Sequence, residues 1–498
     1  MPEREFRLYD TMSRTVKPLA TVEPRHLKFY SCGPTVYSYA HIGNFRTFIT
    51  ADLILRTAVA LGWQVSYVTN ITDVGHLTED DVADAGGEDK MARALKSKDG
   101  EAFANVWDLA EHYANAFKDD WDQLNLTRPM VWPRATQHMR EQIQAVEQLI
   151  ASGHAYATDS AVYFRLDSFP DHGKLSGNRD RDQLYTAVRD IVVDSQKEHP
   201  GDFALWKCDD KHLMQWFSPW GWGFPGWHIE CSVMAMQYLG ETLDLHAGGE
   251  DLVFPHHESE IAQSECLTGH DFANHWVHTR FLQVDGEKMS KSKGNYFTVR
   301  DLVEERGVDP LALRYALMSV PYGKPLNFTM QNLRDSARTI ERYRECRRMV
   351  AQAITRNLPG EDLIGTELNG LFDGALDAMC DDLNTSVALA KALEGTGVIF
   401  READRLSGAS AQSAETYLRR IGDLLGIVRI DEEASAQASD LSGLNEAAID
   451  ARIAERQAAK AARDFARADA IRAELDAEGI ELRDTPEGPV WKRKAVAI

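Results

Sequence analysis

The sequence predicts an α/β fold, in which a parallel-sheet domain is split by an insertion and is followed by an all-α segment and a small α+β segment. An apolar strand pattern ends at Cys32, a helix-like segment covers residues 45–61, and a second strand pattern follows at 65–68. This order is typical of a right-handed βαβ unit. Helical spacing with few strand signals covers 326–430, and a hairpin pattern lies at 480–491.

Composition indicates an ordinary globular chain. Its 498 residues are 44% hydrophobic and 27% charged, which is enough to build three or more domains. No apolar run approaches the roughly 18 residues needed to span a bilayer, so we expect a cytoplasmic protein without a membrane partner. Six cysteines in so long a chain favour metal binding or burial over a disulfide framework. The net charge of −22 argues against a general nucleic-acid coat protein, although arginines gather at 334–348.

The stretch 31–46, SCGPTVYSYAHIGNFR, carries a thiol and a phosphate-binding signal a few residues apart. Cys32 lies where the first strand pattern runs into a Gly-Pro turn. His41 and Asn44 precede the first helical segment, where backbone N–H groups and the helix dipole favour anions. Taken alone, Cys32 is better explained as a buried thiol and His41 as an ordinary helix-start residue, so a functional role needs support from elsewhere in the chain.

Between the two halves of the sheet domain the character of the chain changes. Residues 79–100 are polar and contain glycine, which predicts a mobile loop. An amphipathic helix pattern at 139–150 ends at Gly153, and a short strand pattern follows at 162–164. We interpret this part as an insertion into the sheet.

The second half of the sheet domain contains further metal-binding side chains. Cys32, Cys231, His256 and Glu260 would together supply two thiolates, one imidazole and one carboxylate. His256 and Glu260 are four residues apart and would share one helical face. The spacing is not that of a zinc finger, so the residues alone leave a metal site and scattered burial both open.

A short cationic loop follows at 286–294, GEKMSKSKG. It carries three lysines and two serines between flanking glycines. Such a loop is suited to closing over phosphates.

Five motifs, CGPTVY, HIGN, PGWHIEC, FPHHESE and EKMSKSKGN, occur in this order along the chain. Their sequence and separation closely resemble the cysteinyl-tRNA synthetases, a family of class I aminoacyl-tRNA synthetases. The resemblance is specific over about residues 24–330 and continues more weakly to the C-terminus. It implies a Rossmann-type catalytic domain that ligates L-cysteine to tRNA-Cys, using ATP and a cysteinyl-adenylate intermediate.

The resemblance also implies which residues do the chemistry. It makes Cys32, Cys231, His256 and Glu260 the ligands of one zinc ion per chain, which would bind the substrate thiolate and so reject serine without an editing domain. ATP would arrive with Mg²⁺. The residues implied to contact ATP are His41, Asn44, Gly248, Gly249, Lys288, Ser290, Lys291 and Ser292, and among these His41, Asn44, Lys288 and Lys291 are implied to be catalytic. The implied substrate pocket contains Thr35, Trp227, His246 and Asp251.

Two positions depart from the family pattern. Asn44 replaces the second histidine of the HIGH motif, and its amide can donate a hydrogen bond but cannot carry a proton. Phe224 stands where the family often has arginine, so a charge contact is expected to be missing. Cys208 and His257 lie near the ligands in sequence, and we expect them to be buried or to support the ligands rather than to bind metal.

The resemblance implies a monomer with six parts. These are the first half of the catalytic domain with HIGN (24–127), a connective insertion (128–202), the second catalytic half (203–284), the lysine loop and stem-contact region (285–325), a helical-bundle tRNA-binding domain (326–430), and a linker with a small anticodon-recognition domain (431–498).

Two other functions fit part of the pattern. The cysteine ligase of mycothiol biosynthesis resembles the catalytic half but joins cysteine to an amino sugar and lacks a tRNA-reading end. A non-catalytic, zinc-containing RNA-binding protein on the same scaffold would have little need for Lys288 and Lys291. The synthetase-like stretch 464–491 favours tRNA charging over the first alternative.

Overall fold

The computed structural model describes residues 4–75, 89–177, 195–290, 293–428, 446–462, 464–477, 480–485 and 488–493. The chain divides into two compact units, Met1–Ile427 and Val428–Ile498, which are treated separately below. Among the described residues, no helix combines the length and apolar character needed to cross a membrane.

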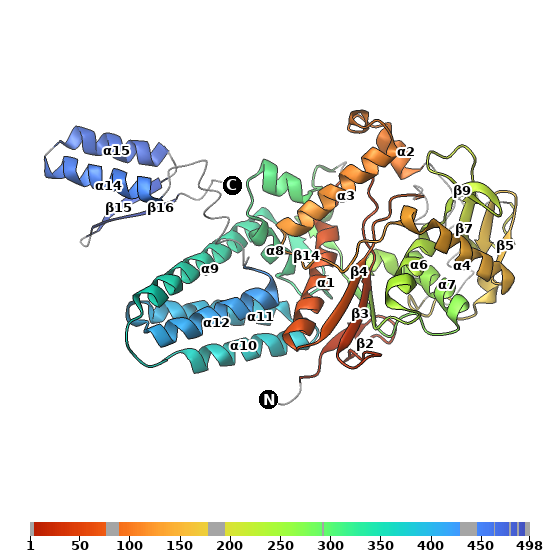
Figure 1. Cartoon of the computed structure of the whole chain (residues 1–498), viewed down its shortest axis with the longest axis horizontal. Helices are drawn as coiled ribbons and strands as arrows, with labels where there is room; N and C mark the ends of the chain where they lie inside the picture. The colour runs from red at the N-terminus through yellow and green to blue at the C-terminus, as the bar shows by residue number, and fades with distance from the viewer. Residues whose placement is uncertain are drawn as a thin grey trace. The chain divides into compact units, whose positions relative to one another are not determined.

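A four-stranded parallel sheet forms the centre of the first unit (Figure 1). Its order is β11 (Trp276–Thr279), β10 (Leu245–Gly249), β3 (His26–Ser31) and β4 (Gln64–Thr69), and each neighbouring pair is parallel. The predicted parallel α/β architecture is therefore confirmed. Because parallel strands end at the same edge, the segments that follow β3 and β10 meet there.

Three helices pack around this sheet and carry most of the predicted site. Helix α1 (Ile42–Ala60) links β3 to β4 and contacts all four strands of the sheet. Its buried face includes Phe45, Phe48 and Ile49. Helices α6 (Trp227–Leu239) and α7 (Glu258–Thr268) pack against each other, and α6 also contacts β3 and β4.

The insertion consists of helices and an antiparallel sheet. Helix α3 (Val106–Gln123) precedes it and α4 (Met139–Ala151) opens it. The sheet has the order β5 (Ala155–Ala157), β6 (Ala161–Phe164), β7 (Phe203–Cys208), β9 (Gly221–Pro225) and β8 (Trp216–Ser218). Because β7 pairs with both β6 and β9, this sheet uses strands on both sides of residue 202, and the parallel sheet resumes only at β10.

Part of the predicted loop at 79–100 is helical, which corrects the expectation for its second half. Residues 76–88 lie outside the described parts of the chain, but α2 (Lys90–Leu95) begins directly afterwards. Asp89 caps α2 because its side chain accepts hydrogen bonds from the backbone N–H groups of Met91 and Ala92. The polar composition predicted a loop, whereas the capping aspartate starts a short helix.

The lysine loop at 286–294 begins in a separate three-stranded sheet. Strands β12 (Leu282–Val284) and β14 (Leu326–Phe328) are parallel, and β13 (Glu287–Lys288) pairs antiparallel with β12. Helix α8 (Pro310–Met318) lies between them in sequence and has proline at its first position, after the capping residue Asp309.

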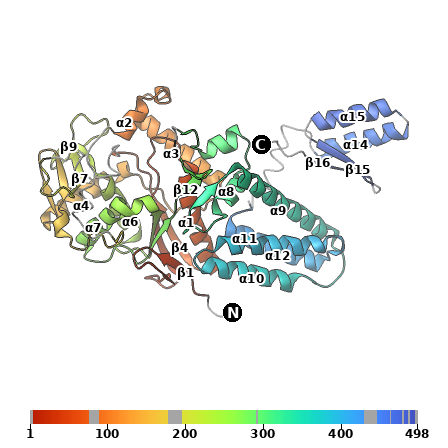
Figure 2. The same cartoon turned by 180° about the vertical axis from the view of Figure 1, so that it is seen from behind.

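A helical bundle follows, as the sequence predicts. It consists of α9 (Met330–Arg356), α10 (Gly365–Cys380), α11 (Thr385–Arg401) and α12 (Gly408–Leu425), which pack on one another (Figure 2). An N-terminal hairpin, β1 (Arg7–Asp10) with β2 (Thr15–Pro18), was not part of the sequence prediction.

A buried charge cluster joins helix α1, which packs on the parallel sheet, to the bundle. We call Asp52, Arg56 and Arg314 the Asp52 cluster. Arg314 is fully buried and forms an ion pair with Asp52, while its guanidinium also donates to the backbone oxygens of Leu124 and Leu425. Arg56 Nε lies 2.7 Å from the Asp52 carboxylate. Every charge in the cluster therefore has an opposite charge or a carbonyl beside it.

The second unit is a small α+β structure. Helices α14 (Glu446–Ala461) and α15 (Phe465–Ala477) precede the antiparallel hairpin β15 (Ile480–Thr485) and β16 (Gly488–Arg493). Its core is formed by a group of apolar residues, namely Ile449, Ile453, Ile471, Leu475 and Ile480. The helices and hairpin agree with the pattern expected from the sequence.

Candidate metal centre and phosphate-binding turn

Cys32 follows β3 at the carboxyl edge of the parallel sheet. Its backbone N–H donates to Ala247 O of β10 (3.2 Å), which fixes the thiol over the sheet edge. The next residue must be glycine, because a Cβ on Gly33 would lie 1.7 Å from Asn70 O. Gly33 N–H instead donates to the Asn70 side chain at 2.8 Å. Close contact between the two loops therefore positions Cys32.

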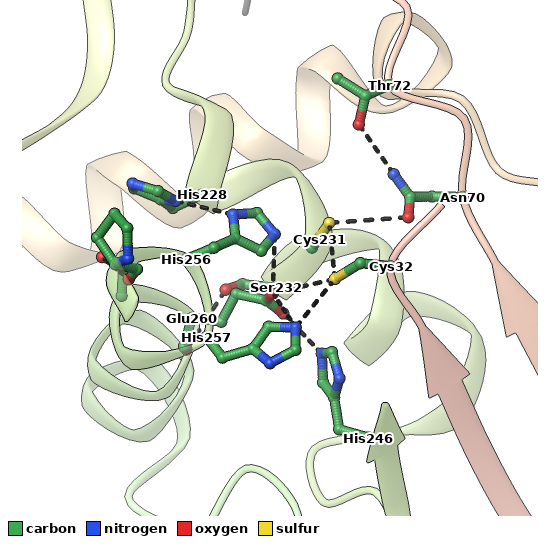
Figure 3. Close-up of polar contacts among 12 residues, drawn as sticks. Cys32, Asn70, Thr72, His228, Cys231, Ser232, His246, His256, His257 and Glu260 are labelled. Atoms are coloured by element: carbon green, nitrogen blue, oxygen red, sulfur yellow. Dashed lines mark hydrogen bonds and ion pairs between the residues drawn. The ribbon is translucent and has the colours of Figure 1, made fainter. Parts of the chain in front are cut away.

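Cys231, His256 and Glu260 approach Cys32 from other segments (Figure 3). Cys231 lies on α6, His256 belongs to the π-helical segment Val253–His257, and Glu260 lies in the first turn of α7. The two sulfurs are 3.8 Å apart, Cys32 Sγ lies 3.3 Å from Glu260 Oε1, and His256 Nε2 lies 3.0 Å from the same oxygen. All four side chains are buried, and one donor atom from each lies within 4.8 Å of the others.

These donors fit a tetrahedral zinc ion. With Zn–S bonds of about 2.3 Å, tetrahedral geometry places two sulfur ligands about 3.8 Å apart. The separation of Cys32 Sγ and Cys231 Sγ is 3.8 Å. Thiolate and imidazole donors also favour zinc over the oxygen-seeking Mg²⁺ or Ca²⁺. We call Cys32, Cys231, His256 and Glu260 the metal cluster.

The side chains of the metal cluster shift one another's pKa values. Burial raises the pKa of the Cys32 thiol, and a hydrogen bond from this thiol lowers the pKa of Cys231 to about 6. Burial opposes a charge on His256, but the negative groups of Glu260 and Cys231 outweigh it and raise the pKa of the imidazole to about 10. Negative donors thus converge around one protonated imidazole. A divalent cation would replace that proton as the balancing charge.

Two further histidines, His246 and His257, surround the cluster. His246 Nε2 lies 2.9 Å from Glu260 Oε2, and His257 Nε2 lies 3.4 Å from Cys32 Sγ. Cys32, His246, His257 and Glu260 therefore form a second group close enough to hold a metal ion. The set with two thiols suits zinc better, and it leaves His246 to orient the second oxygen of Glu260.

Some residues near the cluster were not identified from the sequence. His228 Nδ1 lies 2.9 Å from His256 Nδ1, so one imidazole orients the other. His257 Nδ1 lies 2.7 Å from His278 Nε2, and His278 Nδ1 lies 2.7 Å from Thr11 Oγ1. The many histidines at 246–278 were the signal in the sequence that could have indicated these contacts. The residues they contact, such as His228 and Thr11, lie in other segments of the chain.

His41 and Asn44 form the N-terminal cap of α1. Asn44 N–H donates to His41 Nδ1, and His41 N–H donates to Asn44 Oδ1, each at 3.1 Å. Asn44 thus has a structural role that requires an acceptor oxygen. The reciprocal cap aligns the start of α1, where the positive end of the helix dipole favours a phosphate.

The implied substrate-pocket residues lie in three different environments. The ring of Trp227 stacks on His256 at 4.3 Å between centroids, and His246 is buried against Glu260. Thr35 pairs with Thr72 in the loop after β3. Asp251 is exposed in the short turn that follows β10. Trp227 and His246 therefore touch the metal cluster directly.

Gly248 and Gly249 end β10 beside the cluster. A Cβ on Gly248 would lie 2.8 Å from the His257 ring, and one on Gly249 would lie 2.3 Å from Asp251 Oδ1. At both positions a Cβ would collide with a neighbouring side chain, so the packing of the protein itself requires glycine there.

The lysine loop returns to the start of α1. Ile42 N–H donates to Phe297 O at 3.0 Å, and His41 forms a β-bridge with Thr298. Lys288 is exposed on β13, and the backbone N–H of Ser290 donates to the Asn295 side chain at 2.8 Å. The predicted residues Lys291 and Ser292 lie outside the described residues. The fold brings the HIGN and lysine-loop segments together.

Phe224, at the position where the family often has arginine, is packed against another side chain. Its ring is 3% exposed and stacks on His212 with centroids 3.9 Å apart. His212 forms an ion pair with Asp89. An imidazole thus covers the aromatic ring at this position. Cys208 is half-buried on β7 and lies outside the group of metal-binding side chains.

Comparison with known proteins identifies close relatives. Residues 18–338 match the family model of the tRNA synthetases class I (C) catalytic domain. The chain is similar to the cysteine–tRNA ligase of Salinibacter ruber, with 55% identity over 99% of both chains, and to that of Solibacter usitatus, with 42% identity over 98% of this chain and 100% of the relative.

Solved structures show the same fold at lower sequence similarity. The methionyl-tRNA synthetase of Mycobacterium tuberculosis in complex with methionyl-adenylate superimposes with a TM-score of 0.56 at 15% identity, and the match covers 86% of this chain and 96% of that one.

Proposed function

The chain belongs to the cysteine–tRNA ligases, a family of class I aminoacyl-tRNA synthetases, and on this premise we propose that it activates L-cysteine as cysteinyl-adenylate and transfers it to tRNA-Cys. The observation that carries the proposal is the buried metal cluster at the edge of the parallel sheet. Cys32 of this cluster begins the loop that joins β3 to α1, and the capping residue His41 ends it, so one loop would serve both the metal and the phosphates.

Selection of cysteine is assigned to the metal cluster. Cys32, Cys231, His256 and Glu260 would hold zinc, which when bound accepts a thiolate as a further ligand and binds a serine hydroxyl poorly. His246 holds the second oxygen of Glu260, and His228 orients His256. These contacts fix the donors and exclude water, because every one of these side chains is buried.

Activation is assigned to the two segments that meet at α1. The cysteine carboxylate attacks the α-phosphate of ATP, forming a carboxylate–phosphorus bond while the bond to pyrophosphate breaks. His41 and the positive end of the α1 dipole would stabilise the phosphates, with Asn44 holding His41 in place. Lys288, Ser290, Lys291 and Ser292 would contact the leaving pyrophosphate, and Mg²⁺ would accompany ATP.

The glycines that end β10 would admit the nucleotide. Gly248 and Gly249 end β10 at the carboxyl edge of the parallel sheet, where nucleotides bind in open α/β sheets, and they are assigned to the adenosine on that ground. The bundle α9–α12 and the small C-terminal unit are assigned to tRNA binding. Exposed arginines on α9, including Arg338 and Arg348, are consistent with this assignment.

Full-length similarity distinguishes the proposal from cysteine ligation to an amino sugar. The Salinibacter cysteine–tRNA ligase is matched over 99% of its length, which includes the C-terminal unit. Deleting residues 431–498 should therefore weaken tRNA charging while leaving cysteine-dependent ATP–pyrophosphate exchange intact. Unchanged tRNA affinity in the truncated protein would favour the amino-sugar reaction.

The decisive experiment is aminoacylation of unfractionated tRNA with cysteine and with serine, with zinc measured on the same sample. We expect cysteine to be attached, serine to be rejected by a factor of about 10⁴ or more, and one zinc per chain. Cysteine-dependent pyrophosphate exchange without attachment to tRNA would contradict the proposal. A non-catalytic RNA-binding protein would show neither reaction.

A further inference from the structure

The segment 295–298, which follows the lysine loop, is fastened to that loop at its first residue. The Asn295 side chain accepts a hydrogen bond from Ser290 N–H at 2.8 Å and donates one to Lys288 O at 3.2 Å. Both bonds go to the backbone of the loop, so they position the loop whatever its side chains do.

The other end of this segment is fastened to the turn at His41–Asn44. Phe297 O accepts from Ile42 N–H at 3.0 Å, and Thr298 forms a β-bridge with His41. Thr298 is buried, and its N–H donates to Asp301 Oδ2 at 2.7 Å. The backbone of one short segment therefore contacts both motifs to which phosphate binding is assigned.

The side chain of Tyr296, between these two anchor points, lies against the His41 ring. The ring centroids are 5.4 Å apart and the ring planes are 89° apart, which is the favourable edge-to-face arrangement. Asn44 N–H holds only Nδ1 of the imidazole, and torsion about the Cβ–Cγ bond of histidine is soft. The tyrosine ring is a second contact, and it fixes the plane of the imidazole.

The plane of the His41 ring decides where its donor nitrogen points. Because Nδ1 accepts from Asn44 N–H, the neutral imidazole carries its proton on Nε2. A donor that stabilises developing charge is effective only if it is already aimed before the reaction. Fixing the ring plane therefore aims the Nε2–H group.

Tyr296 is itself held from the opposite side. Its hydroxyl donates to Tyr39 O at 3.5 Å, and burial raises its pKa to about 12, so the hydroxyl keeps its proton. The Tyr39 ring packs on Tyr113 of α3 with centroids 4.9 Å apart, and the Arg300 guanidinium lies 5.3 Å from the centre of the Tyr39 ring. Helix α3 thus supports the tyrosine that supports His41.

We propose that Tyr296 is a positioning residue for His41 and holds the imidazole in the orientation in which Nε2–H donates to the phosphates of ATP, an inference that rests on the proposed function. Without the tyrosine ring, His41 keeps its bond to Asn44 but its plane is no longer fixed. The loss falls on stabilisation of the transition state, because Tyr296 does not belong to the metal cluster that selects cysteine.

The test measures cysteine-dependent ATP–pyrophosphate exchange with the full-length protein. Tyr296→Leu should lower kcat about tenfold and leave the KM for cysteine unchanged. Tyr296→Phe keeps the ring and should stay within about twofold of the wild-type kcat. In a His41→Ala background, Tyr296→Leu should cause no further loss, because the tyrosine acts through that imidazole. A further tenfold loss in this background would overturn the inference.

A matched control uses another tyrosine that packs on a histidine. Tyr238 on α6 contacts the His138 ring, with centroids 5.6 Å apart and planes 68° apart, and neither residue belongs to the metal cluster or to the two phosphate-binding motifs. Tyr238→Leu should leave kcat unchanged. An equal loss of kcat in Tyr238→Leu and Tyr296→Leu would assign the effect to packing in general and would contradict a specific role for Tyr296.

A readout without catalysis separates this inference from the proposed function. Diethyl pyrocarbonate modifies accessible imidazoles, and mass spectrometry follows the modification of His41 alone. His41 should react severalfold faster in Tyr296→Leu than in the wild-type protein or in Tyr296→Phe, because the leucine side chain covers less of the ring. Equal rates in all three proteins would show that the contact is not made. If the wild-type protein catalyses no exchange, the proposed function fails, whereas these rates still decide whether Tyr296 holds His41.

Discussion

Two groups of charged or ionisable side chains are buried in the first unit, and they differ in how they are neutralised. In the Asp52 cluster, one carboxylate faces two guanidinium groups, and backbone carbonyls accept the remaining N–H groups of Arg314. In the metal cluster, two sulfurs, a carboxylate and an imidazole converge on one point. Both groups have strongly shifted pKa values. The convergence of donors, rather than burial or a pKa shift, therefore distinguishes a binding site from a structural ion pair.

Removing a thiol from the metal cluster should have the largest effect. Cys231→Ser is expected to abolish zinc binding and to slow cysteine-dependent pyrophosphate exchange about a thousandfold or more, because the pocket loses the metal that selects the thiol. Zinc content and exchange rate measure the two effects. Cys266→Ser changes a thiol on α7 outside the cluster and should retain both. A zinc-loaded Cys231→Ser protein would show that the cluster is not the metal site.

Breaking the Asp52 cluster should affect stability instead of zinc. Asp52→Asn leaves Arg314 buried without its carboxylate and should lower the free energy of unfolding by about 3 kcal/mol. Urea unfolding measures this loss, and zinc content serves as the matched readout. Loss of zinc in the folded variant would erase the proposed distinction between the two groups.

A residue beside the metal cluster should have a smaller effect on metal binding. His246→Gln removes the imidazole that contacts Glu260 Oε2 and should weaken zinc binding about tenfold. Competition with a chelator measures the affinity. If His246→Gln lost zinc as completely as Cys231→Ser, the second donor set, with His246 and His257, would become the better assignment.

The smallest expected effect is the loss, at low pH, of the stability that the Asp52 cluster contributes. Burial alone would raise the pKa of Asp52, but Arg56 and Arg314 outweigh it and lower the pKa from 3.8 to about 2. Because the folded pKa is depressed, the stabilisation is present above the unfolded value and is lost as pH falls toward 2. The stability difference between wild type and Asp52→Asn should narrow by about 1 kcal/mol between pH 5 and pH 3. A constant difference would rule out this linkage.

Local patterns in the sequence predicted the strands and helices that carry the site. The apolar run before Cys32 is β3, and the helical spacing after Asn44 is α1. His256 and Glu260 meet as their spacing predicts, although His256 belongs to an irregular turn before α7. These features depend on residues that are close in sequence, so a local sequence pattern can predict them.

Contacts between distant segments could not be predicted in this way. Nothing local indicates that Asp89 pairs with His212, or that His278 contacts His257. The resemblance to a known family supplied the four proposed ligands together, because only the fold brings Cys32 to Cys231. Asn44 illustrates the same limit: its reciprocal cap with His41 became evident from geometry alone.

Helix α1 connects the turn at His41–Asn44 to the helical bundle. Its 19 residues span about 28 Å, and its first turn is tied to the segment after the lysine loop, because Ile42 N–H donates to Phe297 O. Further along α1, Arg56 donates to Asp423 O near the end of α12, and Asp52 pairs with Arg314 of α8, which donates to Leu425 O in the same part of α12. The helix therefore cannot tilt without stretching bonds at two distant anchor points. Alignment of the turn at His41–Asn44 is thereby set partly by the bundle, which gives a mechanical reason for the two regions to move as one body.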